Sequence, residues 1–236
     1  MLKMVHCKNT PDQIHFLHIG KTGGTALKYA LANMELNVSW LHIHTHATTF
    51  SDIPQGERIF FFLRNPISRF VSAFYSRQRK GYPKYNVPWT ELETVAFSAF
   101  KTPNQLAMAL SSPIPAERDL AILAMNNIGH VRNFYSRWLG SAEALEKRAQ
   151  DIFFVGLQEY LDEDCAALAK LLDVGSLNLP VNDIDAHRNP SNVDRTLESM
   201  AISNLEKWYE GDFQTLEICR NIAQKAGFGG SLGTPN

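Results

Sequence analysis

The chain has 236 residues, a hydrophobic content of 44% and a formal net charge of −1. A chain of this size can bury one sizeable core, so we expect a single domain over residues 1–236. The near-neutral charge argues against a nucleic-acid-binding protein and against one built around a highly anionic polymer. No apolar run reaches membrane-spanning length, and the N-terminus lacks the charged-then-apolar pattern of a signal peptide.

The three cysteines, Cys7, Cys165 and Cys219, lie far apart and are odd in number. An odd number of widely separated cysteines argues against a disulfide framework and against a zinc cluster. A reducing compartment fits this usage. With no signal peptide or membrane segment evident, we expect a cytoplasmic protein.

The first predicted element is a strand at His15 that breaks into a glycine-rich turn and continues as a helix through Leu27. Backbone N–H groups at a helix start carry partial positive charge, glycines let the backbone close around phosphate oxygens, and Lys21 adds a full charge. The turn therefore predicts a phosphate-binding loop. A nucleoside triphosphatase loop reads G-x-x-x-x-G-K-[ST], but His15 stands where its first glycine belongs, so this loop is shorter.

Three alternating histidines, His42, His44 and His46, follow the first helix. In an extended segment they would share one face. A neutral imidazole can accept a proton, because the pKa of histidine is about 6.5. A metal site is a second interpretation, but the nearest carboxylate or thiol is Asp52, and we expect no metal. We expect a structural role for His42 and for the unpatterned histidines. These are His6, His15, His18, His130 and His187.

A second strand-to-helix corner lies at Arg64. Residues 58–63 form a continuous apolar run typical of a buried parallel strand, and Pro66 suits a first helical turn. Apolar residues at helical spacing from 67 to 75 predict the inward face of this helix. We expect Arg69, Ser72 and Ser76 on another face, so that Arg64 and Ser72 can reach one ligand. Residues 58–90 contain seven basic and no acidic residues, which predicts a positive field.

The remaining chain predicts mainly helices, at residues 90–100, 103–111, 115–127 and 129–148. An aromatic stretch at 81–89 either stacks on a sugar or pins a long loop. A last apolar strand at 151–157 precedes a helix at 159–172, a polar linker at 182–192, helices at 193–210 and 212–226, and a frayed glycine-rich tail at 227–236. The alternation predicts an α/β fold with a central parallel sheet flanked by helices, and a largely helical portion beside it.

The two corners together resemble the nucleotide-binding signatures of sulfotransferases that use 3′-phosphoadenosine-5′-phosphosulfate. One signature is the shortened loop from Lys21 to Thr25, which reads Lys-Thr-Gly-Gly-Thr. The other is Arg64 followed eight positions later by Ser72, within R-[ND]-P-x-x-R-[FY]-x-S. The likeness is closest to the carbohydrate O-sulfotransferases of the heparan sulfate 2-O and 6-O type and their bacterial relatives. The sequence departs from many members at Gly20, where they have proline.

The resemblance implies a P-loop-type three-layer fold whose helical portion binds the acceptor. It implies that Arg64 and Ser72 bind the 3′-phosphate of the donor. The first loop would bind the 5′-phosphosulfate through Gly20, Lys21, Thr22, Gly23, Gly24 and Thr25.

The resemblance also implies that a histidine between the two motifs is the general base. We choose His46, with His44 as its orienting partner or substitute. Arg137 is a candidate near the acceptor, and residues 187–191 match the family's loop beside the nucleotide. The implied reaction is in-line transfer of a sulfuryl group to a hydroxyl of a carbohydrate or glycolipid, leaving adenosine 3′,5′-bisphosphate. No metal is required, because Lys21 and the loop supply the positive potential.

Two other functions stay open. The first is a P-loop phosphotransferase, such as a small-molecule kinase using ATP and magnesium. The missing first glycine argues against it, as does Arg64 where an acidic residue would be expected. The second is a non-catalytic nucleotide-binding or glycan-binding module, which the retained Lys21 and the histidines disfavour. The residues specify neither the acceptor hydroxyl nor an oligomeric state.

Overall fold

A four-stranded sheet forms the centre of the computed structural model, which describes residues 13–34, 39–182, 189–190, 192–227 and 230–232. Its strands are β1 (Ile14–Phe16), β2 (Leu41–Ile43), β3 (Arg58–Leu63) and β4 (Ile152–Leu157). All neighbouring pairs are parallel, in the order β2-β1-β3-β4. Parallel pairing brings the carboxyl ends of all four strands to the same edge of the sheet.

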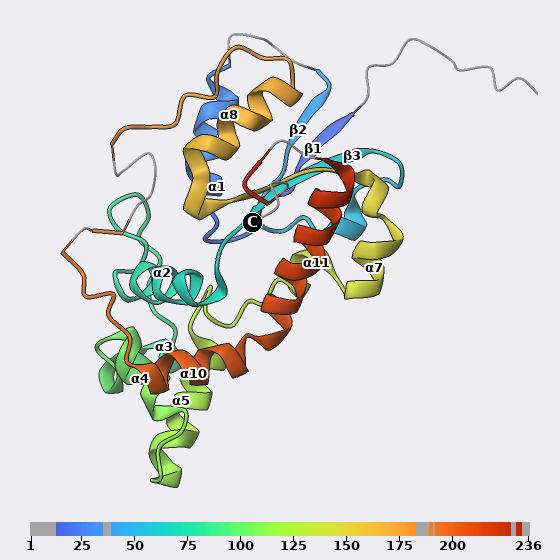
Figure 1. The fold of residues 1–236 in the computed structure, drawn as a ribbon. Coiled ribbons are helices and arrows are strands. Elements are labelled where there is room, and N and C mark those ends of the chain that lie inside the picture. The colour runs from blue at the N-terminus through green and yellow to red at the C-terminus, as the bar shows by residue number, and fades with distance from the viewer. Residues whose placement is uncertain (1–12, 35–38, 183–188, 191, 228–229, 233–236) are drawn as a thin grey trace, which may run out of the picture.

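Helices cover both faces of this sheet, as Figure 1 shows. On one side lie α1 (Gly24–Ala32) and α8 (Leu161–Leu171), and on the other α7 (Ala142–Lys147) and α11 (Glu210–Ala226). Along β3, Phe60 and Phe62 join the core beneath α1 and α8, whereas Phe61 joins the core beneath α11. Strand β3 is apolar throughout because neither of its faces meets water. The predicted α/β fold with a flanked parallel sheet is confirmed.

A second group of helices packs around its own core beside the sheet (Figure 1). It comprises α2 (Pro66–Gln78), α3 (Glu91–Ala99), α4 (Pro103–Ala109), α5 (Pro115–Asn127) and α10 (Ser199–Trp208). Local signals start several of these helices. The Asn65 side chain accepts backbone hydrogen bonds at the start of α2, and Thr90 and Thr102 do so for α3 and α4. The predicted largely helical portion is therefore present.

Two helix predictions are wrong. The helix expected at 129–148 is a loop followed by α6 (Ser136–Leu139) and α7. His130 adopts a φ of 66° within the loop, and Gly140, with a φ of 76°, ends α6 before α7 begins. The helix expected from residue 193 begins at Ser199, since the Asp194 carboxylate accepts a hydrogen bond from the Thr196 N–H and favours a local turn. In the described part of the chain we find no helix long and apolar enough to cross a membrane.

The expected linker and tail fall partly outside the described residues. Where the tail is described it is held in place, contrary to the expectation of fraying. The Ser231 N–H and hydroxyl both donate to the Asp164 carboxylate, and Leu232 is buried.

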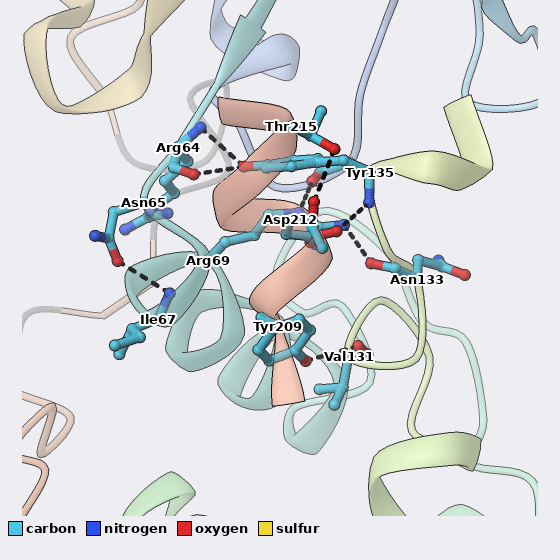
Figure 2. A network of polar contacts seen from close by, with 12 residues as sticks. Arg64, Asn65, Ile67, Arg69, Val131, Asn133, Tyr135, Tyr209, Asp212 and Thr215 are labelled. Atoms are coloured by element: carbon cyan, nitrogen blue, oxygen red, sulfur yellow. Dashed lines mark hydrogen bonds and ion pairs between the residues drawn. The ribbon is translucent and has the colours of Figure 1, made fainter. Parts of the chain in front are cut away.

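The buried Arg69 of α2 connects the sheet to the helices that surround the site (Figure 2). Its Nε donates to the Gly20 carbonyl at 3.0 Å, its Nη2 donates to the Asn133 carbonyl at 2.8 Å, and its Nη1 lies 3.4 Å from the Asp212 carboxylate. The other Asp212 oxygen accepts the Tyr135 N–H at 2.7 Å. One guanidinium thereby holds the turn after β1, the loop before α6 and the start of α11.

Tyr135 extends this network to the end of β3. Its hydroxyl donates to the Arg64 carbonyl and accepts the Arg64 N–H, and its ring lies beneath the Arg69 guanidinium at 4.8 Å (Figure 2). Both strand-to-helix corners of the sheet are therefore fixed by the same buried cluster.

Replacing Arg69 with methionine tests this network. The change leaves the Asp212 carboxylate and two buried carbonyls without their donor, so we expect a loss of roughly 3–5 kcal/mol in the free energy of unfolding, measured by urea denaturation. The matched control is Arg220→Met, because the Arg220–Glu217 pair is exposed, at 38% and 56%. It should lose at most about 1 kcal/mol. Equal, small losses in both variants would contradict the network's structural role.

Candidate active site

A cavity of about 1210 Å³ opens at the carboxyl edge of the sheet. Its walls include residues that stand one or two positions after the end of each of the four strands, which is where ligands bind in open α/β sheets. Of the described residues that line it, none is Asp or Glu, whereas six are Lys or Arg. These are Lys21, Lys28, Arg64, Arg77, Lys84 and Arg195. The cavity is thus suited to an anionic ligand.

The loop between β1 and α1 forms one wall. Lys21 and Gly23 adopt φ angles of 69° and 84°, which fold the backbone into a tight turn. Gly23, Gly24 and Thr25 line the cavity, so the positive end of α1 faces it. The first turn of α1 has neither a side-chain cap nor an acidic residue, which leaves its backbone N–H groups available to a ligand. This is the geometry of an anion-binding helix start.

Two residues expected in this loop shape it instead of lining the cavity. The Gly20 carbonyl is held by Arg69, and the Thr22 hydroxyl donates to the Ile19 carbonyl at 3.0 Å. Neither residue is among the described lining residues.

The Lys21 side chain has no anionic partner among the described residues. Burial, and after it the nearby Arg79, Arg64 and Arg69, together lower the pKa of Lys21 to about 7. Within the described residues, no hydrogen bond or ion pair holds its ammonium group. A buried charge of this kind is costly unless a ligand of opposite charge pairs with it.

The corner after β3 forms another wall, which Arg64, Ser68 and Ser72 line together. The Arg64 Nε donates to the Ser68 hydroxyl at 2.9 Å and lies 4.0 Å from a Glu159 carboxylate oxygen. Burial lowers the pKa of Arg64 from its ordinary value. The structure therefore brings Arg64 and Ser72 to the same cavity as Lys21.

Arg69 does not share this wall, contrary to expectation. It was predicted on the face that carries Ser72 and Ser76, and both serines line the cavity. Arg69 is buried instead, because its acceptors lie inside the protein at Gly20, Asn133 and Asp212.

The segment expected beside the nucleotide is described only at Asn189 and Pro190, since 187, 188 and 191 lie outside the described residues. Asn189 lines the cavity, and its side-chain amide donates to the Ser72 carbonyl at 3.4 Å. Arg137 lies outside the described lining, where its Nη1 donates to the Asn133 side chain at 2.9 Å.

His46 opens on the cavity near Lys21. Its Nδ1 lies 3.3 Å from the His18 carbonyl, and the Trp138 Nε1 donates to the His46 carbonyl at 3.0 Å. A carbonyl oxygen only accepts, so Nδ1 carries the proton and Nε2 keeps a lone pair. Burial lowers the pKa of His46, and Lys28, Lys21 and Arg137 lower the pKa further. The ring can therefore accept a proton at neutral pH.

The expectation that three histidines share one face is wrong. Strand β2 ends at Ile43, and the chain turns at His46, so the alternation stops at His44. The His44 Nε2 lies 2.9 Å from the His15 Nδ1, and His44 and His42 both stack on the His15 ring. His44 is absent from the described lining, and within the described part of the chain no hydrogen bond or ring contact joins it to His46. The structure therefore does not place His44 as the partner of that ring.

Two other histidines, His18 and His130, line the cavity with His46, although neither belongs to a functional pattern in the sequence. Burial lowers the pKa of His18 to about 2 and that of His130 to about 3, so both rings stay neutral. The only sequence signal for His18 is its position three residues before Lys21. His130 has none, because a turn far along the chain, with a φ of 66°, carries it to the cavity.

Comparison with known proteins identifies the family. The model of the Sulfotransferase family matches residues 8–217. No curated protein matches the sequence. The match includes both strand-to-helix corners, the histidine-containing segment between them and the helical portion. The family's reaction, the transfer of a sulfuryl group to an acceptor, agrees with an anion-binding cavity that also holds a proton acceptor. The chain belongs to the sulfotransferase family.

Proposed function

We propose that the enzyme transfers a sulfuryl group from 3′-phosphoadenosine-5′-phosphosulfate to a hydroxyl of a carbohydrate or glycolipid. The observation that carries this proposal is the cavity whose described lining has six cationic side chains and no carboxylate. Its cations stand at two separate corners, at Lys21 beside the start of α1 and at Arg64 beside Ser68 and Ser72. A donor with a 5′-phosphosulfate and a 3′-phosphate carries negative charge at two separate groups, one for each of these corners.

In this proposal the residues after β1 hold the leaving group. The N–H groups at the start of α1 and the Lys21 ammonium neutralise charge on the bridging oxygen as its bond to sulfur breaks. Pairing with phosphate also raises the pKa of Lys21 from about 7, so the bound lysine is charged.

The proposed base is the His46 Nε2. It takes the proton of the acceptor hydroxyl as the new oxygen–sulfur bond forms, while the sulfur–oxygen bond of the donor breaks. The hydrogen bond from Nδ1 to the His18 carbonyl supports this role, because it fixes the tautomer in which Nε2 is the acceptor.

A sugar acceptor is supported by the rim of the cavity. Tyr29 and Tyr85 line it and are 41% and 51% exposed, and each follows a lysine that also lines it, Lys28 and Lys84. Exposed aromatic rings offer apolar faces and a polar edge, which suits the alternating faces of a sugar ring.

The assignment of the 3′-phosphate is tested with Arg64→Ala. Loss of a charge-assisted hydrogen bond should weaken adenosine 3′,5′-bisphosphate by about 1.5–3 kcal/mol, and should barely affect an adenosine 5′-phosphate that lacks the 3′ group. Isothermal titration calorimetry without magnesium measures both ligands. Equal losses for the two ligands would show that Arg64 does not contact the 3′-phosphate.

The role of Lys21 is tested by comparing turnover with binding. Charge on the bridging oxygen grows only in the transition state, so Lys21→Ala should lower kcat by roughly 10²–10³. The dissociation constant of adenosine 3′,5′-bisphosphate should change far less, because the backbone N–H groups remain. If kcat and affinity fall by the same factor, Lys21 is an ordinary binding residue.

The base is tested with His46→Ala, which should lose roughly 10²–10⁴ in kcat with donor binding nearly intact. In the unmodified enzyme, neutral His46 is the active form and its pKa is lowered, so kcat should rise with pH and reach half its maximum below pH about 6.5. His44→Ala should lose less, because the His44 ring contacts His15.

The control is His42→Ala, since the His42 Nε2 contacts Gln13 and the residue is outside the described lining. It should leave kcat unchanged. An active His46→Ala beside an inactive His44→Ala would exchange the two roles, and two active variants would place the base elsewhere.

A further inference from the structure

His18 is a buried residue of the cavity wall. The proposed mechanism uses its backbone carbonyl but gives its side chain no role. The residue is 4% exposed and lies between β1 and Lys21. Its Nδ1 is buried and has no hydrogen-bond partner within the described residues. Buried polar atoms are nearly always paired, so an unpaired ring at this position calls for another reason to retain it.

The His18 ring packs directly against His46. The two ring centroids are 3.8 Å apart, with planes tilted by 39°. The backbone carbonyl of His18 accepts the Nδ1 proton of the same imidazole at 3.3 Å. His18 thus restrains His46 in two ways, through its ring and through its backbone.

The same ring also contacts the phosphate-binding loop. A Cβ placed on Gly24 would lie 2.2 Å from the His18 Cδ2 and 2.3 Å from its Nε2, which is too close for any side chain. Gly24 is the first residue of α1. The ring therefore fills the space between the helix start and the His46 imidazole.

We infer that His18 is a positioning residue, whose ring sets the orientation of His46 relative to the start of α1. The inference rests on the proposed role of His46 as base. Because a small misplacement of a catalytic group lowers the rate strongly, a fixed wall behind the imidazole has a direct effect on turnover.

The charges around His46 agree with this role. Lys28 of α1, Lys21 of the loop and Arg137 are the cations that act on its pKa, and His18 and His130 are the neighbouring rings. Burial is the largest cause of the lowered pKa of His46. The His18 ring contributes to that burial and, with a pKa of about 2, adds no charge of its own.

The test is His18→Ala, which removes the ring and keeps the backbone carbonyl. Rates are expressed per site that binds adenosine 3′,5′-bisphosphate, so unfolded protein does not count. We expect kcat at the pH optimum to fall by roughly 10- to 100-fold. The ascending limb of the pH profile should also move up toward the ordinary histidine value of about 6.5, because water reaches His46.

A double variant separates positioning from general packing. If His18 acts through His46, adding His18→Ala to His46→Ala should lower kcat no further. His42→Ala changes a histidine outside the described lining, so it should alter neither kcat nor the ascending limb of the pH profile. Should His18→Ala fail to fold, His18→Asn, which also lacks the ring, should show the same shift.

Other outcomes overturn the inference. His18→Ala could lower kcat without shifting the ascending limb of the pH profile, and its effect on kcat could add to that of His46→Ala. This result would show that His18 only packs the core. An unchanged His18→Ala beside an inactive His46→Ala would reject His18 and leave the base in place. A fully active His46→Ala would reject the proposed base and the role of His18 with it.

Discussion

The site depends on one buried guanidinium. Arg69 donates to the Gly20 carbonyl, to the Asn133 carbonyl and toward Asp212. Its planar guanidinium group has enough N–H donors to reach all three acceptors at once. The turn after β1, the loop before α6 and the start of α11 are far apart in sequence, and Arg69 contacts all three. Through Tyr135, the same cluster holds the backbone of Arg64. The two strand-to-helix corners that line the cavity are therefore placed relative to each other by Arg69, which is not among the described lining residues.

The cavity has an electrostatic cost that a ligand relieves. Its described lining brings Lys21, Lys28 and Arg64 together without a carboxylate. Burial, and after it the nearby Arg79, Arg64 and Arg69, lower the pKa of Lys21 to about 7. Like charges held close together weaken the empty fold. A ligand with several negative charges removes that repulsion, so the same arrangement that strains the free protein favours anion binding. The Glu159 carboxylate lies 4.0 Å from the Arg64 Nε and offsets part of the positive charge at that corner.

The histidines show how environment divides one residue type between two roles. His15, His42 and His44 stack at the sheet, and the His15 Nε2 contacts the Glu57 carboxylate. Around the cavity, His18, His46 and His130 lie near Lys21 with lowered pKa values and no carboxylate on their rings. In the first group only His15 contacts Glu57, and burial lowers the pKa of His15 and of His44 as well. In the second group, His46 has the hydrogen bond that leaves Nε2 able to accept a proton.

Local features of the sequence determined the sheet, both strand-to-helix corners and the glycine-rich turn before α1. The apolar run of β3, the glycines around Lys21 and the Asn65-Pro66 helix start act over a few residues, so they can be identified without the fold. The two helices that were predicted wrongly failed where a single residue, Gly140, or a local turn at Asp194 overrode the periodicity. The tertiary structure alone decided the burial of Arg69, the separation of His44 from His46 and the arrival of His18 and His130 at the cavity. Each of these depends on contacts between segments distant in the chain, and residue spacing carries no information about such contacts.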